Sequence, residues 1–213
     1  MNIILLGAPG SGKGTQAELI VDKYKLYHFQ TGQLARDIAK KDARIKEIID
    51  SGKLIPHEEM TMYAIDFLSK NVKEMTDILF EGFPRFIPQY EALEDFLKTK
   101  GDDIDAVISL DINEEEVIKR VSSRRICDKC GESYNLITNP PPSENACECG
   151  GTLIQREDDN PDAVKVRLDY YHKNTEELID YLDKKGKLTR VNGMNSIGIV
   201  FEEISAVIDT LSK

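Results

Sequence analysis

Long apolar runs are missing from this sequence. Its 213 residues are 40% hydrophobic and 31% charged, and no uninterrupted apolar stretch approaches the roughly twenty residues of a membrane-spanning helix. The start also lacks the basic region and cleavage site of a secretory signal, because apolar residues 3–6 run directly into a glycine-rich segment. We therefore expect a cytoplasmic protein without a membrane partner.

Positive charge is also scarce. The chain has 28 lysines and arginines against 38 aspartates and glutamates, a formal net charge of −10. Proteins that bind nucleic acid gain affinity by neutralising phosphates with surplus lysine and arginine, so this composition argues against a nucleic-acid partner. An anionic substrate must therefore meet a local basic cleft.

Cysteine is limited to four residues, all between positions 127 and 149. This cluster is too local to staple a chain of this length, and in a reducing compartment it favours metal binding over disulfides. We find no internal repeat and no low-complexity tract. The length suits one substantial core with, at most, a small inserted module.

A glycine-rich loop is the most informative feature that the sequence has. It follows apolar residues 3–6, precedes a helical pattern and reads Gly7-Ala8-Pro9-Gly10-Ser11-Gly12-Lys13-Gly14-Thr15. Glycines let several backbone N–H groups converge on one anion, and the following helix adds its positive end. The loop varies the pattern G-x-x-x-x-G-K-[ST] by placing Gly14 before Thr15. This context favours a cradle for nucleotide phosphates over a plain turn.

Strand and helix patterns alternate along the chain. Short apolar strands are predicted at residues 2–6, 27–29, 77–80, 106–111 and 187–191, and helices at 13–24, 33–50, 58–73, 88–98, 114–125, 161–185 and 196–211. The alternation predicts an α/β fold with a doubly wound, parallel, five-stranded sheet whose ligands bind beyond the carboxyl ends of the strands. A helical excursion at 30–59 and a loop-rich, cysteine-bearing excursion at 122–158 interrupt it.

Four further motifs follow the loop in order. They are Thr31-Gly32 with Arg36, then Glu81-Gly82-Phe83-Pro84-Arg85, then Arg120 with Arg124 and Arg125, then Arg156-Glu157-Asp158-Asp159 with Arg167. With the loop, these motifs resemble adenylate kinase of the bacterial type with a long lid, and the resemblance covers the whole chain. It implies a P-loop core at residues 1–29, 60–121 and 159–213, a helical AMP-binding domain at 30–59 and a small zinc-ribbon-like lid at 122–158.

The resemblance also implies an activity. An adenylate kinase transfers the terminal phosphoryl group of ATP to AMP with Mg²⁺, giving two ADP, and so serves nucleotide homeostasis. Two alternatives remain open at this point: a kinase of another nucleoside monophosphate or with broad donor use, and a non-catalytic nucleotide-binding or zinc-ribbon module. A single chain carries every group that the reaction needs, which favours a monomer.

The family's functional residues carry over one by one. For ATP the resemblance implies Gly10, Ser11, Gly12, Lys13, Gly14, Thr15, Arg120, Arg124 and Asn195. For AMP it implies Thr31, Arg36, Ile55, Gly82, Arg85, Gln89, Arg156 and Arg167. Lys13, Arg85, Arg124, Arg156 and Arg167 are the expected catalytic groups, since guanidinium groups grip phosphate oxygens with paired hydrogen bonds.

Other charged residues are assigned by position. Arg120 precedes Arg124 by four residues, which would place both on one helical face, with Arg120 against the ATP adenine. Arg44 and Arg190 are expected to be surface ion pairs. Closing or hinge contacts of the lid are assigned to Arg125, Asp158 and Asp159.

The cysteines form two pairs, each followed by glycine. Cys127 and Cys130 are separated by two residues, whereas Cys147 and Cys149 are separated by one. Paired cysteines on two tight turns favour a closed, structural Zn²⁺ site, with two disulfides or four free thiols as alternatives. Zinc-bearing members typically have C-x-x-C or a close variant at the second pair, so C-x-C is a departure.

Two departures concern magnesium. The family usually has aspartate at the positions of Gln33 and Glu81, where the carboxylates orient water around Mg²⁺. Glu81 keeps the charge and reaches one methylene further, whereas Gln33 loses the charge. We expect Mg²⁺-dependent activity with altered metal affinity or rate.

Overall fold

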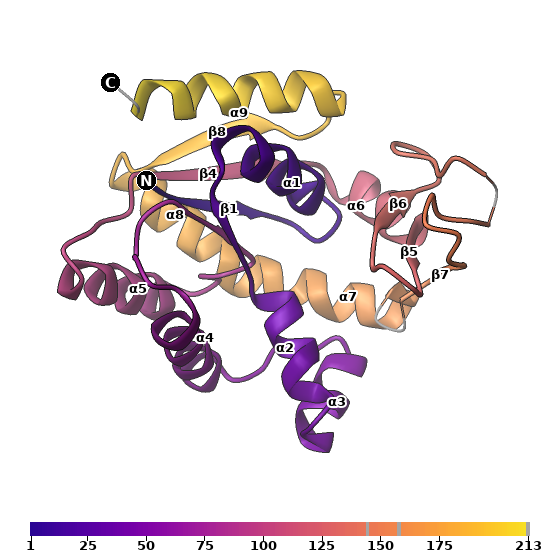
Figure 1. Cartoon of the computed structure of the whole chain (residues 1–213), viewed down its shortest axis with the longest axis horizontal. Helices are drawn as coiled ribbons and strands as arrows, with labels where there is room; N and C mark the ends of the chain where they lie inside the picture. The colour runs from indigo at the N-terminus through magenta and orange to yellow at the C-terminus, as the bar shows by residue number, and fades with distance from the viewer. Residues whose placement is uncertain (144, 157–158, 212–213) are drawn as a thin grey trace.

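The computed structural model describes residues 1–143, 145–156 and 159–211. A five-stranded sheet in the order β2-β3-β1-β4-β8 runs through it, and every neighbouring pair of strands is parallel (Figure 1). Its strands are β1 (Asn2–Gly7), β2 (Tyr27–Gln30), β3 (Ile78–Glu81), β4 (Ala106–Asp111) and β8 (Leu188–Asn192). The predicted α/β sheet is confirmed, and β1 lies at its centre with the glycine-rich loop at its carboxyl end.

Helices cover both faces of the sheet (Figure 1). They include α1 (Lys13–Tyr24) and α9 (Ile197–Leu211) on one face, and α4 (His57–Asn71), α5 (Ile87–Thr99) and α8 (Glu176–Lys184) on the other. The alternation of β1 explains the two layers: Ile3 and Leu5 pack toward α1 and α9, whereas Ile4 and Leu6 pack toward the opposite helices. These elements begin and end within two residues of the predicted bounds, except α8, which belongs to a longer predicted helix.

The predicted helix at 33–50 is two helices. The structure has α2 (Thr31–Ala39) and α3 (Ala43–Asp50), separated by a short break. Asp42 causes the break, because its carboxylate accepts from the backbone N–H groups of Arg44 at 2.9 Å and Ile45 at 3.2 Å. An N-cap of this kind starts a new helix instead of continuing the old one.

The predicted helix at 114–125 is too long. The structure ends α6 (Glu114–Ser122) at the serine pair, where the hydroxyls of Ser122 and Ser123 donate to carbonyls four residues earlier. Such bonds compete with the helix backbone and favour its end. Arg124 therefore lies on β5 (Arg124–Cys127), and the prediction that it shares a helical face with Arg120 was wrong.

The cysteine-bearing excursion contains a sheet of its own. β5 pairs antiparallel with β6 (Ser133–Asn135) and β7 (Leu153–Ile154), in the order β6-β5-β7. Figure 1 shows this small sheet beyond α6, away from the main sheet. We call residues 122–158 the lid.

The predicted helix at 161–185 runs as α7 (Pro161–Tyr170), a π-helical turn (Tyr171–Thr175) and α8 without interruption. It carries the chain from the lid back along the core (Figure 1). Within the described residues, none of the helices combines the length and the apolar character that crossing a membrane requires.

Candidate functional site

A cleft of about 1350 Å³ opens at the carboxyl ends of β1, β2 and β3. It is lined by the glycine-rich loop, α2, the start of α5, the end of α6, the lid and α7. Every nucleotide-binding residue predicted above lines it: Gly10, Ser11, Gly12, Lys13, Gly14, Thr15, Thr31, Arg36, Ile55, Gly82, Arg85, Gln89, Arg120, Arg124, Arg156, Arg167 and Asn195. The structure therefore brings the set together, while the individual roles stay predictions.

Backbone geometry explains why the loop needs glycine. Gly7 has φ +143°, and a Cβ there would lie 2.7 Å from both the Leu110 carbonyl oxygen and Ser11 Oγ. Gly12, with φ +95°, directly precedes α1 and leaves the N-terminus of that helix open to the cleft. A side chain at Gly7 would displace the loop, so its shape depends on this glycine.

Lys13 lies among the positive groups of the cleft. Its ammonium donates to the carbonyl oxygens of Gly7 and Ala8, each at 2.7 Å. Burial lowers the pKa of Lys13 to about 7; the Glu81 carboxylate opposes this, and the charges of Arg85, Arg167 and Arg124 add to it. The cationic side chains around Lys13 thus outnumber the carboxylates that neutralise them. A bound polyanion would relieve the repulsion between these cations.

The pKa of Arg85 is lowered for the same reasons as that of Lys13. Burial, followed by the charge of Arg167, lowers the pKa of Arg85 to about 10. Its Nε donates to the Gly82 carbonyl oxygen at 2.8 Å, which fixes the guanidinium beside the strand end. Arg85 remains charged at neutral pH and can bind a phosphate.

Asp159 holds two of the arginines. Its fully buried carboxylate accepts two hydrogen bonds from the Arg124 guanidinium, with Nε at 2.8 Å, and one from Arg167 Nη1 at 3.1 Å. The prediction had placed Asp159 among the closing contacts and missed this pairing across 35 positions of the chain. Arg156 lines the same cleft, whereas Asp158, assigned with Asp159, lies outside the described residues.

Arg36 and its neighbours on α2 form another side of the cleft. Gln33 accepts from Arg36 Nη2 at 3.1 Å and donates to both carboxylate oxygens of Asp37. Thr31 Oγ1 donates to the Glu81 carbonyl oxygen at 3.3 Å. The amide of Gln33 therefore links a phosphate-binding candidate to a carboxylate on its own helix.

Glu81 is held by a histidine that the sequence reasoning missed. Its carboxylate lies 3.0 Å from His28 Nε2, and the Gln30 amide lies 3.1 Å from His28 Nδ1. Each ring nitrogen of His28 thus has a polar partner, and Nε2 can donate to the Glu81 carboxylate. Burial would raise the pKa of Glu81, but the bond and charge of His28 and the charge of Lys13 outweigh it and lower the pKa. The sequence signal that could have found His28 is its position. Residues 28 and 30 lie on β2, which pairs with the strand that ends at Glu81.

The remaining assigned residues lie as follows. Arg120 donates to Glu116 Oε1 at 2.7 Å and to the Gly193 carbonyl oxygen at 3.0 Å, and Asn195 donates to Glu203. Arg125 donates to the carbonyl oxygens of residues 122 and 124. The two predicted surface ion pairs are confirmed, with Arg44 on Glu59 and Arg190 on Asp111, Asp180 and Asp183.

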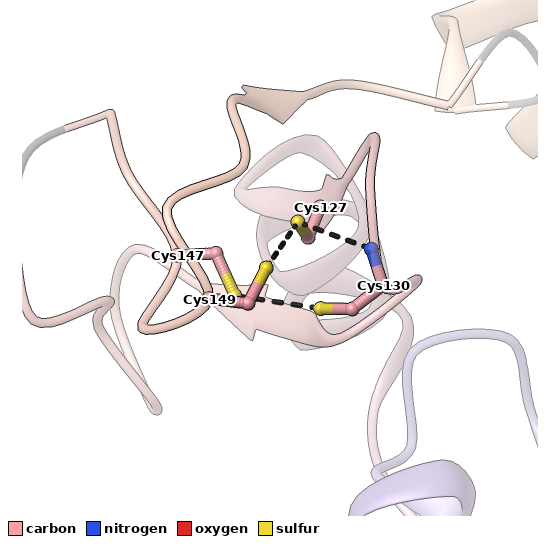
Figure 2. A group of neighbouring side chains, drawn as sticks. All are labelled: Cys127, Cys130, Cys147 and Cys149. Atoms are coloured by element: carbon pink, nitrogen blue, oxygen red, sulfur yellow. Dashed lines mark hydrogen bonds between the residues drawn. The ribbon is translucent and has the colours of Figure 1, made fainter.

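The four cysteines converge in the lid (Figure 2). Their sulfur atoms all lie within 4.8 Å of one another, and the Cys127–Cys149 and Cys130–Cys147 sulfurs are 3.5 Å apart. The backbone N–H groups of Lys129 and Cys130 donate to Cys127 Sγ, and the Tyr134 hydroxyl lies 3.3 Å from Cys147 Sγ. The C-x-C pair thus reaches the same point as the C-x-x-C pair.

Comparison with known proteins gives consistent matches. A family model described as adenylate kinase matches residues 5–187. The chain is 42% identical over 218 residues to the adenylate kinase of Bacillus pumilus, covering 100% of both chains, and 43% identical over 218 residues to that of Archaeoglobus fulgidus, again covering 100% of both. It is 41% identical over 213 residues to that of Methanothrix thermoacetophila, covering 98% of each.

Proposed function

The chain belongs to the adenylate kinase family, and from this premise we propose that it catalyses reversible transfer of the terminal phosphoryl group of ATP to AMP. It is a nucleoside monophosphate kinase, with ATP, AMP and ADP as its expected substrates. A phosphate oxygen of AMP attacks the γ-phosphorus, and the bond from that phosphorus to the bridging oxygen of ADP breaks. Two ADP molecules result.

One observation carries this proposal: cationic groups from distant segments line a single cleft. They are Lys13, Arg36, Arg85, Arg120, Arg124, Arg156 and Arg167. Because the transition state of phosphoryl transfer spreads negative charge over the moving group, catalysis depends on positioned cations and on exclusion of water. Lys13 and the loop amides would hold the donor phosphates, while Arg36 and Arg85 would hold the AMP phosphate. Arg124, Arg156 and Arg167 would surround the transferred group.

Magnesium is the expected cofactor with ATP. The residues fit a hydrated ion, since the half-buried Glu81 carboxylate is held in its charged form beside the loop, with Oε1 3.7 Å from the Cβ position at Gly14. Bound with ATP, the ion would neutralise phosphate charge. In this arrangement His28 holds one carboxylate oxygen, and the carboxylate would orient the ion's water ligands.

Zinc is the metal that fits the cysteine cluster. A tetrahedral site with Zn–S bonds of about 2.3 Å requires sulfur–sulfur distances of about 3.8 Å, close to those in the lid. With four thiolate ligands no coordination position remains for substrate, so the ion would be structural. Its role would be to hold the small lid together.

We further infer that residues 30–59 and the lid close over bound nucleotides as separate units. Closure would bring Arg36 from one side and Arg124 and Arg156 from the other toward the phosphates, and would exclude water. The protein would act as a cytoplasmic monomer in nucleotide homeostasis, since one chain supplies every group named here.

A direct test uses ADP as the only substrate. Adding the protein and Mg²⁺ to ADP should yield ATP and AMP in equal amounts, resolved by ion-exchange chromatography. Binding of ATP without formation of AMP would favour a non-catalytic binding module. An assay of AMP, GMP, CMP and UMP as acceptors, each with ATP, separates an adenylate kinase from a kinase of another monophosphate.

A further inference from the structure

Two helix starts meet on the side of the cleft that we propose binds AMP, and neither helix has an ordinary N-cap. α4 begins at His57 after Pro56, and α5 begins at Ile87 after Phe86. Neither Pro56 nor Phe86 makes a side-chain hydrogen bond to its helix, although Ser, Thr, Asp or Asn commonly does so at this position. An aromatic residue at an N-cap gives up a favourable bond, so its ring is expected to serve another purpose.

The rings of His57 and Phe86 pack against each other. Their centroids are 5.2 Å apart and their planes differ by 33°. Both side chains are half-buried, and Phe86 also lines the nucleotide cleft. The pair therefore joins the start of α4 to the start of α5 at the wall of the cleft.

One buried amide joins the same two segments. Gln89, 3% exposed, accepts from the backbone N–H of Arg85 at 2.9 Å and donates to the His57 carbonyl oxygen at 3.2 Å. Its oxygen and its nitrogen each retain capacity for one more bond. The orientation of this amide therefore depends on the separation that the stacked rings maintain.

We propose that His57 and Phe86 are positioning residues for the acceptor nucleotide. The stack fixes the distance between the two helix starts, and this fixes both the Gln89 amide and the backbone of Arg85. His57 also lies near the end of segment 30–59, at the start of α4, so the stack lies where that segment joins the core. The inference rests on the proposed function and assigns it two further residues.

Steady-state kinetics on single variants tests this inference. Phe86→Ala and His57→Ala should each raise the KM for AMP about three- to tenfold, the range expected for loss of an aromatic pair, and leave the KM for ATP unchanged. Phe96→Ala is the matched control, because Phe96 is a half-buried phenylalanine on α5, the helix that Phe86 precedes, and does not belong to the stack. It should leave both KM values unchanged.

Phe86→Trp is the conservative variant and also a reporter. It keeps a ring for His57 to pack on, so the KM for AMP should stay within about twofold of the parent value. Since the sequence has no tryptophan, the indole is the only one in the protein. Its fluorescence should respond to AMP in the absence of any phosphoryl donor.

The possible outcomes separate the positioning role of His57 and Phe86 from the proposed kinase function. Equal rises in the KM values for AMP and ATP, or an unchanged KM for AMP in Phe86→Ala, would overturn the positioning role while leaving the kinase intact. If the parent protein fails to convert ADP to ATP and AMP, the proposed function is wrong. Melting temperatures of all variants identify unfolding, and if Phe86→Ala does not fold, His57→Ala and Phe86→Trp decide the question.

Discussion

The Lys13 ammonium donates to two loop carbonyls and experiences the charge of three guanidinium groups. With a pKa of about 7 it is mostly neutral at about pH 8 in the free protein. Bound phosphates would raise this pKa toward its ordinary value, so nucleotide binding should take up about one proton at about pH 8 and little below about pH 6, where Lys13 is already charged.

Calorimetry of ATP binding in buffers of different ionisation enthalpy measures this uptake. At about pH 8 the nucleotide phosphates are fully ionised and contribute little. Lys13→Met should abolish the uptake. A binding enthalpy of the parent protein that does not depend on the buffer would contradict the assignment.

Glu81 should govern the response to magnesium. Glu81→Gln keeps a similar shape but loses the charge, so the Mg²⁺ concentration for half-maximal activity should rise about tenfold. Gln33→Ala is the comparison, because the Gln33 amide is engaged with Arg36 and Asp37. A magnesium titration in which both variants match the parent would remove Glu81 from the metal's surroundings.

Sequence motifs predicted which residues meet in the cleft but not their partners. Lys13 and the arginines belong to short motifs with a known chemical purpose. The bond from Arg124 to Asp159 spans 35 positions, and the His28 bond to Glu81 spans 53. Such pairs depend on strand register and on how the lid packs, and neither leaves a local pattern.

At the scale of elements, Asp42 separates α2 from α3. Asp42→Ala removes the acceptor for two backbone N–H groups and should lower the free energy of unfolding by about 1 kcal/mol. Urea denaturation measures the loss. Asp50→Ala, at the other end of α3 and paired with Lys46, should cost about half as much, because exposed ion pairs contribute about 0.5 kcal/mol.

The lid has too little apolar core to hold its fold alone. Its buried cluster consists of Cys127, Tyr134, Cys147 and Leu153, and two of these are candidate ligands. Below about 40 residues a domain usually needs a metal or disulfides. A strong chelator should therefore unfold the lid before the core, with loss of activity and of amide-exchange protection confined to the lid.

Gly151 offers a sharper test of the metal site. A Cβ there would lie 2.4 Å from Cys127 Sγ, so Gly151→Ala should displace a ligand and lower the zinc content and affinity at least tenfold. Gly198→Ala is the control, because its Cβ meets nothing within 4 Å. Normal zinc content in Gly151→Ala would contradict a four-cysteine site with this geometry.

Periodicity predicted the core elements and failed where side chains end helices. The buried strands alternate cleanly, and their helices have one apolar face, so their bounds were recoverable. The errors at α3 and α6 came from Asp42 and from Ser122 and Ser123, whose hydrogen bonds to the backbone override a helical pattern.

At the scale of the whole molecule, a chain of net charge −10 carries a strongly cationic cleft. Asp159 makes this possible, because its buried carboxylate lies on Arg124 and Arg167 and reduces their mutual repulsion. Asp159→Asn should therefore destabilise the protein by about 2 kcal/mol. This is less than the cost of breaking a fully buried ion pair, because both arginines remain partly exposed.

Inorganic phosphate should recover more of this stability in Asp159→Asn than it adds to the parent, since an anion bound by the two arginines replaces the missing charge. Thermal melts of both proteins with and without phosphate measure the difference. Asp183→Asn is the matched control, because Asp183 pairs with Arg190 at the surface and is 51% exposed. Equal phosphate effects in the parent and in Asp159→Asn would mean that the arginines do not share one anion, and the cleft would then lack the arrangement on which phosphoryl transfer depends.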